Sequence, residues 1–304
     1  MKIAFYNVEN LFLQPGYDYQ KSISKTTALA KTILEIDPDI CLMCEVGGEI
    51  SLNSFNYNYL TNQYITHIKK GNSDRGIELA ALVSSSFGNE VDYISHKDHS
   101  INFNYPFEIE RNLSSNEMLY PSHKFSRDCI GIKIGPNDNP KLIILFVHLK
   151  SKLDKDGVDP EGMLRREAEV KALINLYKTY QKQYPDTPII LSGDFNGNAS
   201  PNNTDLEFKS IYQDTSLLEL FDLMQIPEEQ RLTHIYFTKN GVMKNSQLDY
   251  FFVPYSLKDK ININGTGVYR YRDHLGALLR MPQHSYERAA MPSDHYPIVL
   301  ELSI

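Results

Sequence analysis

Short apolar runs recur along this chain, and most of them end beside a polar residue. Runs of this length that are rich in Val, Ile and Phe and bounded by turn residues indicate buried β-strands. They are too short for membrane-spanning helices, which need about 20 apolar residues. We therefore predict a layered α/β protein with strands at residues 2–7, 39–45, 77–84, 129–134, 141–149, 188–194, 248–253 and 298–302.

Two stretches carry the periodicity of amphipathic helices, residues 24–36 and 161–184. Pro38 and Pro185 follow just beyond their ends, where proline cannot continue a helix. A third, weaker helix is expected to begin near Asp214. No internal repeat, low-complexity block or flexible linker divides the 304 residues, so we predict one domain, residues 1–304.

The net charge and the three cysteines restrict the class of protein further. The formal net charge of −7 argues against indiscriminate binding to polyanions, although it allows a local basic groove or a bound cation. Cys41 and Cys44 have a spacing found in redox and zinc sites, but on a strand they point to opposite faces and cannot share a metal. With Cys129 they are expected to pack as unpaired thiols. Because no classical signal segment is evident, we expect a cytoplasmic protein.

Polar side chains gather at the ends of the predicted strands, where binding groups often collect in sheet proteins. Each of them alone has a structural explanation, such as a turn or a cap, but together they provide the groups that phosphodiester hydrolysis requires. These residues are Asn7, Glu45, His148, Asp194, Asn196, Asp249, Asp294 and His295. No Gly-rich phosphate loop with an adjoining Gly-Lys-Ser/Thr is present, so nucleotide-driven phosphoryl transfer has no support.

Their chemistry suggests a metal site and a general base. Glu45 and Asp294, with Asn7 nearby, offer the carboxylate and amide oxygens that Mg²⁺ or Mn²⁺ prefers. His295 can accept a proton from an attacking water if Asp249 orients its ring and stabilises the imidazolium. We therefore expect hydrolysis without a covalent nucleophile.

The remaining three residues of this set are expected to handle the phosphate. Asp194 and Asn196 can position the water and a phosphate oxygen, and His148 can donate to the phosphate or to the departing alkoxide.

Two long excursions, residues 95–124 and 255–292, separate the predicted strands. The second contains the run Tyr269-Arg270-Tyr271-Arg272. Interleaved Tyr and Arg side chains can stack on bases and contact phosphates, so Arg270 and Arg272 are candidate substrate-binding residues. A solvated loop would have a similar composition.

Eight motifs in this sequence resemble those of the endonuclease/exonuclease/phosphatase superfamily, which has the fold of deoxyribonuclease I. They run in family order at residues 5–10 (FYNVEN), 42–46 (LMCEV), 74–77 (DRGI), 125–128 (FSRD), 147–152 (VHLKSK), 193–196 (GDFN), 248–250 (LDY) and 293–297 (SDHYP). The resemblance spans nearly the whole chain. It implies a four-layered α/β sandwich with two central, mostly antiparallel sheets flanked by helices, and divalent-metal-dependent hydrolysis of a phosphate ester.

The resemblance supports the roles given above and adds further residues. Arg127, in Phe-Ser-Arg, is similar to a phosphate-contacting arginine of deoxyribonuclease-like members. Asp74 stands near the position of an acid that supports the second histidine in those nucleases, and Glu78 is the competing candidate. Lys150 follows His148 in a segment that looks like that of bacterial nuclease-like members, where cationic residues track the sugar-phosphate backbone.

We therefore expect a Mg²⁺-dependent nuclease that cuts DNA or RNA, with no evident protein partner. One alternative is a phosphodiesterase or phosphatase acting on a lipid headgroup or a small phosphate ester. Lipid is less expected, because the chain has no Trp and no obvious Trp/Phe-rich hairpin for a bilayer. The other alternative is a binding module that has lost its activity. This alternative is disfavoured, because every expected catalytic position carries a suitable residue.

Overall fold

Two β-sheets pack face to face in this structure, a computed structural model that describes residues 1–14, 19–114, 120–154 and 157–304. The first sheet has the order β13 (Gly267–Val268), β14 (Ile298–Glu301), β1 (Lys2–Leu11), β2 (Ile40–Val46), β4 (Glu78–Ser84) and β3 (Tyr64–Ile68). The second has the order β5 (Val91–Ser95), β6 (Cys129–Ile134), β7 (Leu142–His148), β8 (Ile189–Asp194), β12 (Asp249–Pro254) and β9 (Leu217–Glu219).

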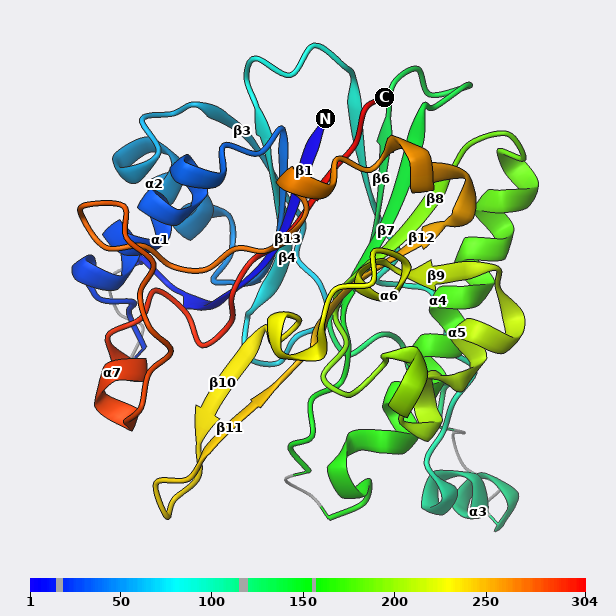
Figure 1. Cartoon of the computed structure of the whole chain (residues 1–304). Helices are drawn as coiled ribbons and strands as arrows, with labels where there is room; N and C mark the ends of the chain where they lie inside the picture. The colour runs from blue at the N-terminus through cyan, green and yellow to red at the C-terminus, as the bar shows by residue number, and fades with distance from the viewer. Residues whose placement is uncertain (15–18, 115–119, 155–156) are drawn as a thin grey trace.

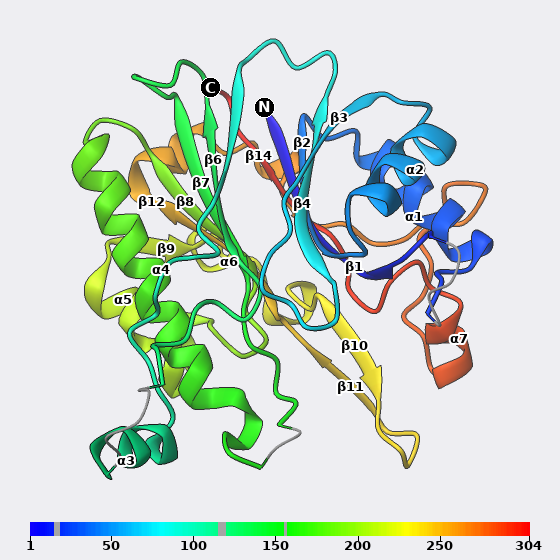
Figure 2. The ribbon, with the colours of Figure 1, turned by 180° about the vertical axis from the view of Figure 1, so that it is seen from behind.

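Helices cover the outer face of each sheet, which completes four layers (Figures 1 and 2). The first sheet is covered by α1 (Ile23–Ile36) and α2 (Glu49–Tyr59), and the second by α4 (Met163–Gln183) and α5 (Lys209–Asp214). Shorter helices are α3 (Pro106–Ser114), α6 (Leu220–Leu223) and α7 (Ser285–Ala289). The hairpin β10 (His234–Phe237) and β11 (Met243–Ser246) projects at the end of the sandwich away from both termini (Figure 1). In the described part of the chain, no helix has the length and apolarity to cross a membrane.

The strands supply a separate apolar core between each pair of layers. On β1, Ile3 and Phe5 face the second sheet, whereas Ala4 and Tyr6 face α1 and α2. Both faces of the strand are therefore buried, which explains why these strands are continuous apolar runs in the sequence.

Each sheet contains a parallel strand pair that determines where the functional side chains meet. Strands β1 and β2 are parallel and joined through α1, while β7 and β8 are parallel and joined through α4. The other strand pairs described in the two sheets are antiparallel. The predicted sandwich of mostly antiparallel sheets is confirmed.

All eight predicted strands and both well-defined helices are present, with ends shifted by at most a few residues. The helix expected to begin near Asp214 is wrong, because α5 ends at that residue and packs its one buried side chain, Ile211, under α4. The excursions are partly ordered: 95–124 contains α3, and 255–292 contains β13 and α7. Residues 115–119 of the first excursion lie outside the described residues.

The cysteines behave as the strand pattern predicts. Cys41 and Cys44 are buried in different cores, on opposite faces of β2. Burial raises the pKa of the Cys41 thiol to about 12, so it stays protonated at neutral pH. Cys129 is also buried and unpaired, and all three are core residues.

Candidate active site

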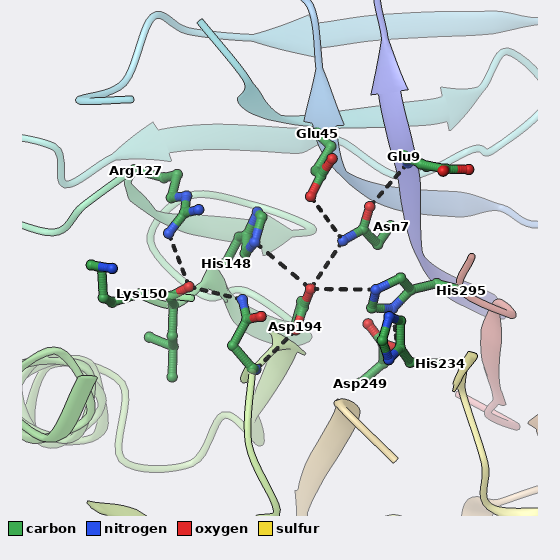
Figure 3. A network of polar contacts seen from close by, with 12 residues as sticks. Asn7, Glu9, Glu45, Arg127, His148, Lys150, Asp194, His234, Asp249 and His295 are labelled. Atoms are coloured by element: carbon green, nitrogen blue, oxygen red, sulfur yellow. Dashed lines mark hydrogen bonds and ion pairs between the residues drawn. The ribbon is translucent and has the colours of Figure 1, made fainter. Parts of the chain in front are cut away.

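The carboxyl ends of the two parallel strand pairs bring four of the expected residues to one end of the sandwich (Figure 3). Asn7 lies on β1 and Glu45 on β2, while His148 and Asp194 are the last residues of β7 and β8 and are register partners. Asp249 begins β12, which runs antiparallel to β8, and it pairs with Asp194 across the sheet. The topology therefore collects residues that lie far apart in the sequence.

Irregular backbone at the first strand pair aims Glu45 into the site. The β1–β2 register shifts between Asn7 and Leu11, and Glu45 has a φ of 65°, which is unusual for a residue with a side chain. Its Oε1 accepts from Asn7 Nδ2 at 3.4 Å, and its Oε2 accepts from the Asn10 N–H at 3.1 Å. Bulges and strained residues of this kind often re-aim side chains at functional sites.

Asp194 is the centre of the polar network (Figure 3). Its Oδ2 accepts from Asn7 Nδ2 at 2.9 Å and lies 3.7 Å from His148 Nε2 and 3.9 Å from His295 Nε2. Its Oδ1 accepts from the Asn196 N–H at 2.9 Å. Burial raises the pKa of Asp194 to about 7, although the positive charge of His295 opposes this shift.

His295 and Asp249 form the expected pair. His295 Nδ1 lies 2.8 Å from Asp249 Oδ2, which leaves Nε2 directed toward Asp194. Burial by itself lowers the pKa of His295, but the carboxylates of Asp249, Asp194 and Asp294 raise it to about 10. In the protein without a bound cation, His295 is therefore an imidazolium at neutral pH.

The electrostatics near Glu45 fit a hard divalent cation. Burial and the charge of Asp294 raise the pKa of Glu45, and the nearby positive charges of Arg75, His295 and Arg127 only partly compensate. A cation would relieve this repulsion. The oxygen donors match Mg²⁺, which keeps several water ligands and needs few from the protein.

Asp294 also has a protein counter-ion that the sequence did not indicate. Arg288, near the end of α7, lies 2.6 Å from Asp294 Oδ2 and 2.7 Å from a carboxylate oxygen of Glu9. The neighbouring Ser293 hydroxyl donates to the carbonyl of Asn7 at 2.7 Å, which fixes this segment against β1.

Arg127 and Asn196 meet at one backbone carbonyl beside His148. Arg127 Nη1 and Asn196 Nδ2 each donate to Leu149 O at 3.0 Å. Burial, together with the positive charges of Arg127 and His295, holds the pKa of His148 well below its usual value. His148 is therefore neutral and can donate one hydrogen bond.

A buried carboxylate on α4 supports these segments. Glu169 is fully buried, and its two oxygens accept from the N–H groups of Ser126 at 2.6 Å and Lys150 at 2.7 Å. Ser126 precedes Arg127, and Lys150 follows the end of β7. Glu169 thus holds together two loops of the site.

The two acids considered as supports for His148 lie in different surroundings. Asp74 is exposed in a turn, and Glu78 is buried and accepts from the Gly71 N–H at 2.7 Å. Among the described residues, neither acid forms a hydrogen bond or ion pair with His148. The carboxylate beside His148 is that of Asp194, whose Oδ2 lies 3.7 Å from His148 Nε2.

The other three expected substrate-binding residues, Lys150, Arg270 and Arg272, make their described contacts outside the polar network around Asp194. Lys150 Nζ donates to the carbonyls of Ser151 and Leu153 in its own loop. The Arg270 guanidinium lies 4.5 Å from the centre of the Tyr296 ring. Arg272 is exposed and lines a hollow against α1.

His234 is a neighbour of the site that the sequence did not single out. Its ring centre lies 4.6 Å from that of His295, and the two residues face each other in an antiparallel bridge. In the sequence, His234 and Tyr236 alternate with Ile235 and Phe237, which is typical of a short strand. This pattern does not show that the strand lies beside the candidate site. Only the packing of the hairpin on the segment before β14 reveals it.

The layered architecture and the residues at its end define a protein with the deoxyribonuclease I-like fold. The chain has the fold of the endonuclease/exonuclease/phosphatase superfamily. A solved structure of a protein of that family from Bacteroides thetaiotaomicron is 16% identical to this chain, with a TM-score of 0.55 over 99% of this chain and 97% of that one.

Two other solved structures share this fold. TDP2 of D. rerio, in complex with a single-strand DNA product, is 13% identical, with a TM-score of 0.62 over 100% of this chain and 99% of that one. The human Nocturnin catalytic domain, with a bound sulfate anion, is 17% identical, with a TM-score of 0.60 over 100% and 94% of the two chains. No protein-family model and no curated protein matches the sequence.

Proposed function

We propose that this chain is a divalent-metal-dependent phosphodiester hydrolase that cleaves nucleic acid. The observation that carries the proposal is the buried His295–Asp249 pair, with His295 Nε2 directed at Asp194 beside Asn7 and Glu45. These are the groups needed to take a proton from water and to hold a phosphate.

Asp249 and His295 are the proposed general-base pair. Asp249 accepts from Nδ1 and so fixes the tautomer in which Nε2 faces an attacking water. Asp194 and Asn196, at the end of β8 and just beyond it, are the proposed groups that orient this water and a phosphate oxygen. His148 donates a hydrogen bond to the phosphate or to the departing alkoxide.

Glu45, with Asn7 and Asp294, is the proposed Mg²⁺ site. A cation held by these residues would supply positive charge that neutralises the phosphate and offsets the carboxylates around His295. Arg127, Lys150, Arg270 and Arg272 remain proposed contacts for the substrate.

Nucleic acid is the proposed substrate because a cation-rich hollow adjoins this end of the molecule. The hollow has a volume of about 620 Å³ and is lined by Glu49, Ile68, Lys69, Lys70, Ser95, His96, Lys97, Asp98 and His99. Asn72 connects it to the site: its side chain donates to Lys97 O at 2.7 Å, and its N–H donates to Arg127 O at 2.7 Å. The similar fold of D. rerio TDP2 holds a single-strand DNA product.

A substrate panel tests the proposal. The purified protein is incubated with Mg²⁺ and double-stranded DNA, single-stranded DNA, RNA, sphingomyelin or inositol phosphates, and the products are quantified. We expect cleavage of nucleic acid that is abolished by a chelator and by His295→Ala. Turnover of the lipid or the inositol phosphates beside intact nucleic acid would instead assign a small phosphate ester as substrate.

A further inference from the structure

A second group of ligand atoms includes the proposed general base, His295. His234, Asp294 and His295 each offer one ligand atom, and the three atoms lie within 4.8 Å of one another. Two imidazole nitrogens and one carboxylate oxygen form a donor set typical of Zn²⁺. The Mg²⁺ site proposed at Glu45 shares Asp294 with this group, but all of its donors are oxygens.

The backbone holds the two histidines in place. His234 and His295 are opposite residues of an antiparallel bridge, flanked by the Ile235 N–H donating to Asp294 O at 3.0 Å and the Tyr296 N–H donating to Thr233 O at 2.6 Å. Side chains directly opposite each other in such a bridge are close neighbours. Tetrahedral zinc with its usual bond lengths places its ligand atoms about 3.4 Å apart. The ligand atoms of this group lie within 4.8 Å of one another.

The side chain of His234 is available as a ligand. Its Nδ1 is buried and has no hydrogen-bond partner among the described residues, while its Nε2 lies 3.9 Å from Asp294 Oδ2. Arg288 shares Asp294 Oδ2, but it has Glu9 as a second partner.

We propose that His234, Asp294 and His295 bind a zinc ion that switches the enzyme off. The ion would displace the proton from His295 Nε2 to the solvent and take up the lone pair that otherwise accepts a proton from water. Zinc binding is independent of the proposed function, whereas its inhibitory effect rests on it.

Calorimetry tests the binding directly. Chelator-treated protein is titrated with Zn²⁺ with and without Mg²⁺, because Asp294 belongs to both proposed sites. We expect one tight zinc site per chain, and binding more than about 10-fold weaker in His234→Phe, because losing even an outer partner of a metal ligand costs about 10- to 100-fold. The matched control is His67→Phe on β3, whose ring stacks on Tyr93 at 5.9 Å, and it should bind zinc like the wild type.

Two outcomes would overturn the proposal: no stoichiometric zinc site in the wild-type protein, or equal affinity in His234→Phe. Anomalous scattering from zinc-soaked wild-type crystals gives an answer that depends on no variant, with the ion expected about 2.0–2.2 Å from all three side chains. An ion located elsewhere would also exclude the site.

Inhibition is then measured as the ratio of hydrolysis with and without Zn²⁺ for each variant. We expect zinc to reduce hydrolysis by the wild type and by His67→Phe far more than by His234→Phe. If no substrate is hydrolysed, the calorimetry still decides the zinc site. If zinc does not bind, the substrate panel still decides the function.

Discussion

At the scale of single residues, the charge of His295 is set by its neighbours. Burial disfavours the imidazolium, yet three carboxylates hold a proton on the ring and raise its pKa to about 10. In the proposed mechanism, His295 therefore acts as a general base only when a bound cation compensates these carboxylates. This dependence cannot be predicted from the sequence, because Asp194, Asp249 and Asp294 come from different segments of the chain.

Replacing Asp249 by Asn tests the pairing. Asp249→Asn should lower turnover by about 10²- to 10⁴-fold, similarly to His295→Ala, because an amide can neither fix the same tautomer nor stabilise the imidazolium. Initial rates of phosphodiester cleavage measure the effect, and the thermal midpoint reports folding. Near wild-type turnover in Asp249→Asn would show that Asp249 does not orient the base.

The same pair predicts a pH dependence of stability in the chelated protein. The pKa of His295 is about 10 in the folded protein and near 6.5 in an unfolded chain, so the folded state binds more protons between these values. Its contribution to stability is complete below about pH 6.5 and is lost as the pH rises toward about 10. The thermal midpoint of the wild type should fall more steeply over this window than that of His295→Gln. Parallel curves would contradict the assignment.

At the scale of elements, the site depends on how closely strand ends approach each other. Gly193, just before Asp194, has a φ of 148°, and a Cβ atom there would lie 2.1 Å from Val147 O on the parallel strand β7. A side chain at this position would force β7 and β8 apart and displace both His148 and Asp194.

Gly193→Ala should therefore destabilise the fold by at least about 1–3 kcal/mol, the usual cost of a strained backbone position. Chemical denaturation measures the free energy of unfolding. Gly88→Ala is the matched control, because a Cβ atom at Gly88 meets no atom within 4 Å. A similar small change in both variants would mean that the strands can separate at little cost.

Helix α4 contributes Glu169, which supports the site from outside it. Glu169→Gln replaces one acceptor oxygen with an amide group that faces a backbone N–H, so one buried donor loses its partner. We expect a loss of about 1–3 kcal/mol in the free energy of unfolding. Glu167→Gln on the same helix should change it by less than about 0.5 kcal/mol, because Glu167 is exposed and its partner Lys171 is also exposed. Equal effects in the two variants would exclude the supporting role.

At the scale of the whole molecule, an acidic protein presents a local cationic surface. The formal net charge is −7, yet Lys69, Lys70 and Lys97 line one hollow near the site. The net negative charge of the protein repels a polyanion at long range, whereas the three lysines attract it locally. Both interactions depend on ionic strength.

Substitution of Lys69 and Lys97 by Ala should weaken polynucleotide binding and reduce its dependence on salt, because each lost phosphate contact lowers the slope. Fluorescence anisotropy at several salt concentrations measures this slope. Lys171→Ala on α4 serves as a control and should leave it unchanged. An unchanged slope in the double variant would separate the hollow from substrate binding.

The sequence by itself determined the layered fold and the candidate residues at the strand ends. An apolar run that ends at a polar residue is a local property of the sequence. The strand ends at Asn7, Glu45 and Asp194 could therefore be recognised without knowledge of the tertiary contacts. Short edge strands such as β3 and β5 were missed, because their half-exposed patterns resemble those of loops.

The tertiary structure alone decided which side chains meet and what charges they carry. The position of His234 against His295, the Arg288–Asp294 pair and the support from Glu169 depend on contacts between segments distant in the sequence. The raised pKa of His295 depends in the same way on three separate carboxylates. Desolvation and Coulomb interactions act through space, so no local pattern of residues can encode their result.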